Sequence, residues 1–192
     1  MRKIILFMML SVDGYFEGPK HDISWHNVGK EVNKFAIQLL KEVDLIIFGK
    51  RMYQTMESFW PQAQDDPTMS KENVTVARLM NNMNKIVISR TLNRIRNHKN
   101  WKNVKIVHKF DAKAIMRLKK QPGKAICVSG SNLALSFIRA GLIDEFRFMI
   151  SPVVIGSGTP LFKGLGGQLK LELIKTRKFR SGKVMQYYRP KK

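Results

Sequence analysis

The stretch 125–162, AICVSGSNLALSFIRAGLIDEFRFMISPVVIGSGTPLF, limits the possible folds of this chain more than any other part of it. It opens with a short β-prone apolar run, 125–129, followed at once by the small polar turn Gly130, Ser131 and Asn132. A helix is expected over 133–140, and the side chains of the turn are expected to cap it. The free N–H groups and the positive dipole end of that helix would then face an anion beyond the strand.

A second apolar run follows this helix. Residues 143–155 predict a long strand, which the segment Gly156, Ser157, Gly158, Thr159 and Pro160 interrupts. Glycines at such a break allow a backbone to approach a ligand closely. The whole stretch therefore predicts a strand, a phosphate-binding turn, a helix and a second strand that ends beside a ligand.

Strands alternate with helices along the rest of the chain. The expected strands are 3–10, 44–48, 85–88 and 104–108, the expected helices are 30–43, 50–59, 70–83 and 112–121, and a closing antiparallel hairpin is expected from 169–176 and 184–189. Residues 3–10 are apolar almost throughout, which is typical of a strand in the middle of a sheet covered on both faces. Residues 60–68 are expected to form a polar loop.

Polar turns directly follow three of these strands. They are Ser11-Val12-Asp13-Gly14, Gly49-Lys50-Arg51 and Ser89-Arg90-Thr91. Backbone N–H groups and cationic side chains at such turns can hold phosphate groups. Two alternatives stay open: Lys50 and Arg51 as solvated basic residues on a first helical turn, and Asp13 as a turn-forming aspartate bonded to its own backbone.

These motifs resemble the dihydrofolate reductase-like family, and within it the C-terminal reductase domain of the riboflavin-biosynthesis deaminase/reductase. The matching segments are the turn Ser129-Gly130-Ser131-Asn132, residues 141–162, the turn 11–14, Gly49-Lys50-Arg51-Met52-Tyr53 and Val87-Ile88-Ser89-Arg90-Thr91. Together they cover nearly the whole chain in the family's order. Ser129 is a departure, since the family commonly has the first of two adjacent glycines there.

The resemblance implies an α/β fold of three layers: a central, mostly parallel mixed sheet with an antiparallel C-terminal hairpin and helices on both faces. It also implies that residues 1–192 form a single domain that commonly assembles as a homodimer. A second interpretation of such an assembly is a homodimeric binding module, with a subunit contact through the strand 143–155 and an apolar helix face.

The resemblance further implies an NADPH-dependent oxidoreductase. The residues expected to bind the cofactor are Ser11, Gly49, Lys50, Arg51, Ser89, Arg90, Thr91, Ser129, Gly130, Ser131, Asn132, Gly156 and Gly158. Arg90 favours NADPH over NADH, because its planar fork bonds the 2′-phosphate in two places. Asp13 is the expected catalytic residue, orienting a small heterocycle or a phosphoribosyl-aminopyrimidine-type substrate for hydride transfer.

Two features restrict the substrate. Dihydrofolate reductases carry an acid near the start of the helix expected at 30–43, whereas the equivalent place here falls near Asn33, which cannot supply a proton. Glu31 lies close by, but a helix N-terminal acid that complements the dipole is the stronger interpretation of it. The chain also lacks H-x-E and P-C-x-x-C motifs, so no zinc deaminase half is expected and no metal site.

Composition adds a competing hypothesis. With 192 residues, 44% hydrophobic, the chain can bury a core, and its lone Cys127 in an apolar strand suits a reducing cytoplasm. No apolar run reaches the roughly 20 residues that span a bilayer, and residues 1–10 are interpreted as a strand rather than a signal peptide. The formal net charge, however, is +21, concentrated in 85–124 and 170–192. A non-catalytic protein that binds nucleic acid or another polyanion is therefore the alternative function, although no sequence-specific nucleic-acid motif is present.

Overall fold

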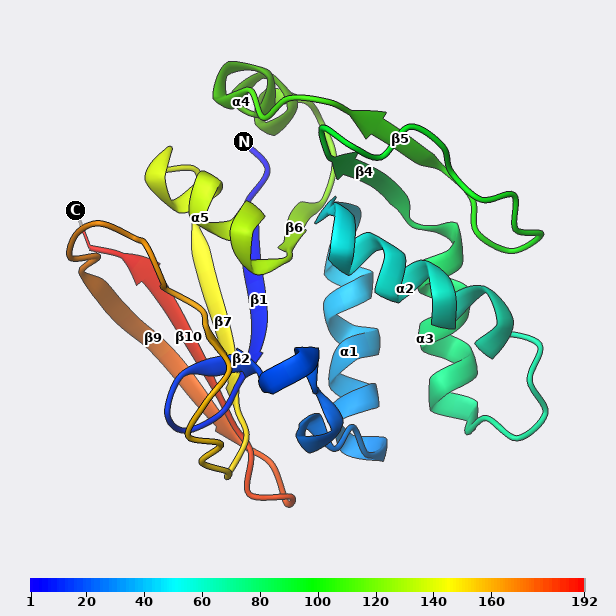
Figure 1. The fold of residues 1–192 in the computed structure, drawn as a ribbon, viewed down its shortest axis with the longest axis horizontal. Coiled ribbons are helices and arrows are strands. Elements are labelled where there is room, and N and C mark those ends of the chain that lie inside the picture. The colour runs from blue at the N-terminus through cyan, green and yellow to red at the C-terminus, as the bar shows by residue number, and fades with distance from the viewer. Residues whose placement is uncertain (192) are drawn as a thin grey trace.

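An eight-stranded sheet forms the centre of the molecule, with its strands in the order β5-β4-β3-β6-β1-β7-β10-β9 (Figure 1). The structure is a computed structural model and describes residues 1–191. The parallel strands are β1 (Ile4–Leu10), β3 (Val43–Gly49), β4 (Asn84–Ile88), β5 (Val104–Val107), β6 (Ala125–Ser129) and β7 (Glu145–Ile150). The hairpin of β9 (Leu171–Lys178) and β10 (Val184–Pro190) joins β7 in antiparallel fashion. The prediction of a mostly parallel mixed sheet is confirmed.

The unbroken apolar run of β1 places it inside the sheet. Ile4, Ile5 and Leu6 are each at most 1% exposed, and β6 and β7 pair with the two sides of the strand. A strand buried on both faces has no solvent-exposed side, so its apolar residues do not alternate with polar ones. The expected central strand is confirmed.

Helices cover both faces of this sheet. Those helices are α1 (Lys30–Glu42), α2 (Lys50–Ala63), α3 (Lys71–Asn82), α4 (Ala112–Lys120) and α5 (Ser131–Arg139). Figure 1 shows α1, α2 and α3 together on one side of the strands and α4 and α5 on the other. One buried apolar cluster joins α4 and α5 to β1, β3, β6 and β7, while two further clusters join α1, α2 and α3 to the opposite face. Three layers are therefore present, as predicted.

Two elements differ in length from their sequence-based predictions. The strand expected over 143–155 is shorter, because β7 ends at Ile150. The chain leaves the sheet after Ser151, since Pro152 has no N–H to donate to the ladder. The helix expected to end near residue 59 continues as α2 to Ala63. Pro61 lies in the last turn of α2, where it provides no N–H for the carbonyl four residues earlier, and both Pro61 and Ala63 are buried.

Four short elements were not anticipated. They are β2 (Tyr15–Glu17), the 3-10 helices η1 (Pro19–His21) and η2 (Ser24–His26), and β8 (Thr159–Pro160). β2 and β8 pair in a separate two-stranded sheet. No helix within residues 1–191 is both long and apolar enough to cross a membrane.

A buried lysine ties β4 to the segments on either side of it. The Nζ atom of Lys85 donates to the carbonyl oxygens of Met83 (2.7 Å), Lys102 (2.9 Å) and Asn81 (3.0 Å), and it lies 4.2 Å from the centre of the Trp101 ring. Burial lowers the pKa of Lys85 to about 7. Three acceptors around one nitrogen favour the protonated form, because an ammonium has three N–H donors. Lys85 thus joins the end of α3 to the segment before β5.

The variant Lys85→Met tests this role. It removes the Lys85 donor from the Met83 and Lys102 carbonyl oxygens, while the Asn81 oxygen still accepts from the Lys102 nitrogen. We expect a loss of about 1–3 kcal/mol in the free energy of unfolding. Urea denaturation followed by circular dichroism measures it. Lys105→Met, on the neighbouring strand and exposed, is the matched control and should change stability by less than about 0.5 kcal/mol. Equal urea midpoints for Lys85→Met and wild type would show that the hydrogen bonds of Lys85 do not stabilise the fold.

Candidate functional site

Five parallel strands bring their carboxyl ends to one edge of the sheet. Strands β1, β3, β4, β6 and β7 end at Leu10, Gly49, Ile88, Ser129 and Ile150, respectively. Ligands of open α/β sheets bind outside the carboxyl ends of the strands. The segments that follow these strands contain all the residues that the sequence proposed for cofactor and substrate, so the fold brings the set to a single edge.

Two glycines lie against each other at the middle of this edge. Phe48 pairs with Ser129 in the β3–β6 ladder, so Gly49 and Gly130 follow at the same level. A Cβ atom added at Gly130 would lie 3.6 Å from the Gly49 nitrogen and 3.5 Å from the Met52 Cβ. Gly130 also has φ +111°, a conformation that favours glycine. The Cβ distances are ordinary van der Waals distances, so the requirement for glycine comes from φ, and the pairing of the strand ends brings the backbone of the two turns together.

Helices α2 and α5 begin directly at these glycines, and neither has a side-chain cap. By contrast, Ser70 caps α3 and Asp111 caps α4 with side-chain oxygens, whereas α1 begins at Gly29 and is uncapped. The first N–H groups of α2 and α5 thus have no acceptor from a capping side chain. Two adjacent helix N-termini with free donors form an environment for an anion.

One expectation about α5 is wrong. Ser131 and Asn132 were expected to cap the helix from a preceding turn, but they are its first two residues. The helix begins earlier because the positive φ of Gly130 reverses the chain within a single residue. Ser129 is the last residue of β6. Ser131 and Asn132 therefore offer backbone N–H groups at the helix start rather than cap oxygens.

The turn after β4 lies beside this pair of helix starts. Lys50 Nζ donates to Thr91 Oγ1 at 3.0 Å, which joins the turn after β3 to the turn after β4. Ser89 Oγ accepts from the backbone nitrogens of Thr91 (3.2 Å) and Leu92 (3.0 Å) and so shapes the turn. Arg90 is exposed and, within residues 1–191, makes no ion pair with a carboxylate. Its guanidinium is thus available to an external anion.

Arg51 is held by a buried acid. Its Nη2 lies 2.9 Å from Glu17 Oε1, and the same carboxylate oxygen accepts from Thr159 Oγ1 at 2.8 Å. Glu17 is only 5% exposed, so Arg51 supplies its counter-charge and links α2 to β2 and β8. The solvated-residue alternative does not describe Arg51, and part of its positive charge is already neutralised.

Asp13 fastens two loops at the end of β1. Its Oδ2 accepts from the Gly156 nitrogen (2.8 Å) and its Oδ1 from the Ile155 nitrogen (3.3 Å). The side chain of Ser11, followed by these two backbone N–H groups, lowers the pKa of Asp13 below its usual value. The loops also meet where the Val12 nitrogen donates to the Val153 oxygen at 2.8 Å. Asp13 therefore holds a distant loop, rather than only its own turn, and is an exposed carboxylate at the site edge.

The two glycines of the 156–158 segment have different surroundings. A Cβ atom at Gly158 would lie 2.1 Å from the backbone oxygen of Glu17, so this position requires glycine for packing against β2. A Cβ atom at Gly156 would meet nothing within 4 Å, although φ is +69° there. Close approach to a ligand is thus open at Gly156, while Gly158 packs against the chain's own backbone.

Two buried polar residues that the sequence did not single out, Ser151 and Lys183, lie in a row with the predicted residue Ser11. Leu10, Ile150 and Val184 are adjacent in the β1–β7–β10 ladder. The next residues beyond this level also lie side by side: Ser11 and Ser151, which follow in the chain, and Lys183, which precedes Val184 because β10 is antiparallel. Each is at most 3% exposed, and Lys183 Nζ donates to Ser151 Oγ at 3.0 Å. Burial lowers the pKa of Lys183, which has no carboxylate partner within residues 1–191. Nothing in the sequence around Lys183, in a Ser-Gly-Lys turn, signals this burial.

The side chain of Asn33 faces α3. Its Nδ2 donates to Asn73 Oδ1 of α3 at 2.6 Å, and the side chain is 4% exposed. Residues 1–191 also contain no group of three His, Cys, Asp or Glu side chains that could hold a metal ion.

Comparisons with known proteins identify the family of this chain. The model of the RibD C-terminal domain family matches residues 2–185. The chain is 34% identical over 188 residues to the uncharacterised protein YyaP of Bacillus subtilis (strain 168), covering 97% of this chain and 94% of that relative.

Solved structures share the fold at low sequence identity. A Shewanella sp. PV-4 protein with a provisional assignment to riboflavin biosynthesis has a TM-score of 0.77 and 21% identity, covering 99% of both chains. The Thermotoga maritima diaminohydroxyphosphoribosylaminopyrimidine deaminase/5-amino-6-(5-phosphoribosylamino)uracil reductase has a TM-score of 0.69 and 13% identity, over 99% of this chain and 57% of that one. Dihydrofolate reductase from Enterococcus faecalis, solved with NADP(H) and RAB-propyl, has a TM-score of 0.59 and 12% identity, over 99% of this chain and 97% of the reductase.

The predicted dihydrofolate reductase-like fold is thereby confirmed, and the match of the family model extends from before β1 into β10. The chain belongs to the RibD C-terminal domain family.

Proposed function

We propose that residues 1–192 form one domain that acts as an NADPH-dependent reductase of a small heterocycle or a phosphoribosyl-aminopyrimidine-type compound. The observation that carries the proposal is the contact between Gly49 and Gly130, from which two uncapped helices begin side by side. This gap and its N–H donors fit the pyrophosphate of a dinucleotide. When bound, the nicotinamide would supply the hydride.

Each turn of the carboxyl edge has a separate role in this proposal. The backbone of Gly49, Gly130 and Ser131 binds the pyrophosphate, with Lys50 and Thr91 beside it. Arg90 binds the adenosine 2′-phosphate through its planar fork, and Ser89 shapes the turn that presents it. Because hydride transfer needs little acid–base chemistry, the remaining task of the protein is to orient the substrate and exclude water.

Substrate orientation is assigned to the β1 and β7 ends. Asp13 and the backbone at Gly156 form the outer part of this region, and Ser11, Ser151 and Lys183 form its buried floor. Lys183 is a positioning residue, since its ammonium holds the Ser151 hydroxyl. The place of Asn33 against α3 argues against a folate-type substrate, because no acid stands there to protonate a pterin.

We also propose a homodimer in the cytoplasm, but not through the strand expected over 143–155. β7 lies between β1 and β10, and its residues Glu145 to Met149 are buried, so it cannot meet a second copy. The free edge strand β9 is the better candidate, because Leu173 and Ile174 are 52% and 48% exposed there. The alternative function is a non-catalytic protein that binds a polyanion. It requires no cofactor site, so a measurement of cofactor binding distinguishes it from the reductase.

A titration with NADPH and with NADH at about 150 mM salt, followed by nicotinamide fluorescence, tests the cofactor. We expect saturable NADPH binding that Arg90→Ala weakens about 10- to 100-fold, since hydrogen bonds to charged groups contribute roughly 1.5–3 kcal/mol. NADH binding should be nearly unchanged in the same variant. Arg94→Ala, an exposed arginine four positions further along the chain, is the control. Absence of saturable binding of either cofactor would contradict the reductase and leave the polyanion function.

Amide hydrogen exchange tests the loop contact of Asp13. Asp13→Ala should speed exchange at Ile155 and Gly156, because their N–H groups lose their acceptors. The pKa of Asp13 is lowered, so in wild type the protection should be full above the ordinary value of 3.8 and should be lost only as the pH falls through the lowered pKa. The control Asp66→Ala, in the distant loop before α3, should leave both amides protected. Unchanged exchange in Asp13→Ala would show that the carboxylate does not hold this loop.

A further inference from the structure

Positive charge is concentrated in one continuous part of the chain. Residues 85–124 contain thirteen Lys and Arg residues and a single acid, Asp111, and so hold +12 of the formal charge of +21. Eleven of these cations are exposed, the exceptions being Lys85 and Lys119. Among the eleven, and counting carboxylates of residues 1–191, only Arg117 lies within 4.0 Å of one, at 3.9 Å from Asp111. This surface is consequently a strong and nearly unneutralised positive field.

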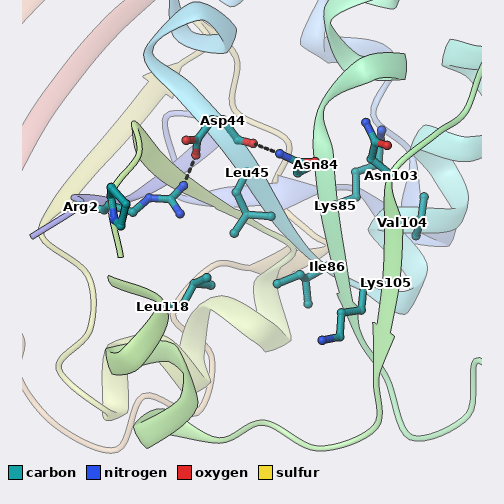
Figure 2. Close-up of a pocket in the computed structure, with 11 residues that line it drawn as sticks. Arg2, Asp44, Leu45, Asn84, Lys85, Ile86, Asn103, Val104, Lys105 and Leu118 are labelled. Carbon is teal, nitrogen blue, oxygen red and sulfur yellow. Dashed lines mark hydrogen bonds and ion pairs between the residues drawn. The ribbon is translucent and has the colours of Figure 1, made fainter. Parts of the chain in front are cut away.

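Two hollows lie on either side of α4 within this basic region. The first, of about 560 Å³, lies between α4 and the starts of β3, β4 and β5. Figure 2 shows Leu45, Ile86 and Leu118 pointing toward one another in it, with Lys105 beside them. Its one carboxylate, Asp44, is paired with Arg2 and accepts from the Lys124 nitrogen at 2.8 Å, so it does not offset the cations.

The second hollow, of about 510 Å³, lies between α4 and the turn after α5. Three cations of α4 line it at helical spacing, namely Lys113, Arg117 and Lys120, together with the apolar Met116 and Leu142. These three residues are named the α4 cations below. Each hollow thus combines an apolar wall with cations, and α4 contributes to both.

These hollows lie at the opposite edge of the sheet from the candidate cofactor site. The first is lined by Arg2, Asp44, Asn84 and Val104, which stand just before or at the beginning of β1, β3, β4 and β5. The parallel strands run away from these residues toward the turns at Gly49 and Ser89. A dinucleotide at the carboxyl edge therefore leaves the α4 cations without a role.

We propose that the surface around α4 binds single-stranded nucleic acid with little sequence preference. Lys105 and the α4 cations would pair with successive phosphates, and each hollow has the size of pockets that accept small organic groups such as a base. A base enters a hollow only when it is unpaired, which favours a single strand over a duplex. The amides of Asn84 and Asn103, which also line the first hollow, already donate to the backbone oxygens of Asp44 and Asn82. The apolar side chains of both hollows provide no base-edge hydrogen bonds, so little sequence selectivity is expected.

Fluorescence anisotropy with a labelled 20-nucleotide uridine RNA, between about 50 and 300 mM KCl, tests the proposal. The test variant is Lys113→Gln, Arg117→Gln and Lys120→Gln together. The matched control carries Lys34→Gln, Lys41→Gln and Lys71→Gln, three exposed lysines of α1 and α3 with the same loss of charge. Circular dichroism melts of all three proteins establish that each is folded.

Binding should weaken by about tenfold or more in the α4 variant, and its slope of log affinity against log salt should be shallower by about 2, since each lost phosphate contact on a single strand removes roughly 0.7. The control should stay within about threefold of wild type. Equal losses of affinity in both variants would overturn the proposal, because they would show that RNA binding depends only on the net charge of the protein. Tighter binding to a blunt 20-base-pair duplex, or to vesicles of phosphatidylserine, would overturn it in favour of that partner.

Discussion

The contact between Gly49 and Gly130 is the constraint on which the candidate site depends. Two neighbouring parallel strands, β3 and β6, end at the same level and each turns directly into a helix. The turn after β6 requires glycine at Gly130, because the φ of +111° there is a conformation that L side chains rarely adopt, whereas a Cβ atom added at either position would make only ordinary van der Waals contacts. Two helix dipoles are thereby aimed at one gap without any charged side chain inside it. Side chains around the gap link it to neighbouring segments. Lys50 donates to Thr91 in the turn that contains Arg90, and Arg51 forms an ion pair with Glu17.

The sheet separates the molecule into two chemically different edges. At the carboxyl edge, donors are backbone N–H groups in fixed geometry, and the cationic side chains of Lys50 and Arg51 are partly engaged by neighbours. At the amino edge, cations of β5 and α4 are exposed and nearly free of carboxylate partners. Fixed backbone donors suit one small ligand of defined shape, whereas mobile surface cations suit a long polyanion. The account therefore assigns a small-molecule function and a nucleic-acid function to opposite ends of the same strands.

Local patterns were sufficient to predict most strands of the main sheet, the order of its elements and the turns at the strand ends, but not the short strands β2 and β8. An apolar run such as 4–10 and the spacing of Val32, Phe35, Leu39 and Leu40 depend only on neighbours in the chain. Contacts between distant segments could not be read in this way. The ion pair of Arg51 with Glu17, the loop contact of Asp13 with Gly156 and the burial of Lys183 against Ser151 join residues 34, 143 and 32 positions apart, respectively. The early end of β7 has a local cause, because Pro152 cannot donate a ladder hydrogen bond.

The central claim is that α2 and α5 together bind the phosphates of the cofactor. Backbone amide chemical shifts during an NADPH titration test it most directly, because they report each helix start separately. The account predicts the largest shifts at Lys50, Arg51, Ser131 and Asn132, with little change at Lys30 and Glu31, where α1 also begins without a cap. Large shifts confined to α1 or to α4, with the starts of α2 and α5 unchanged, would contradict it.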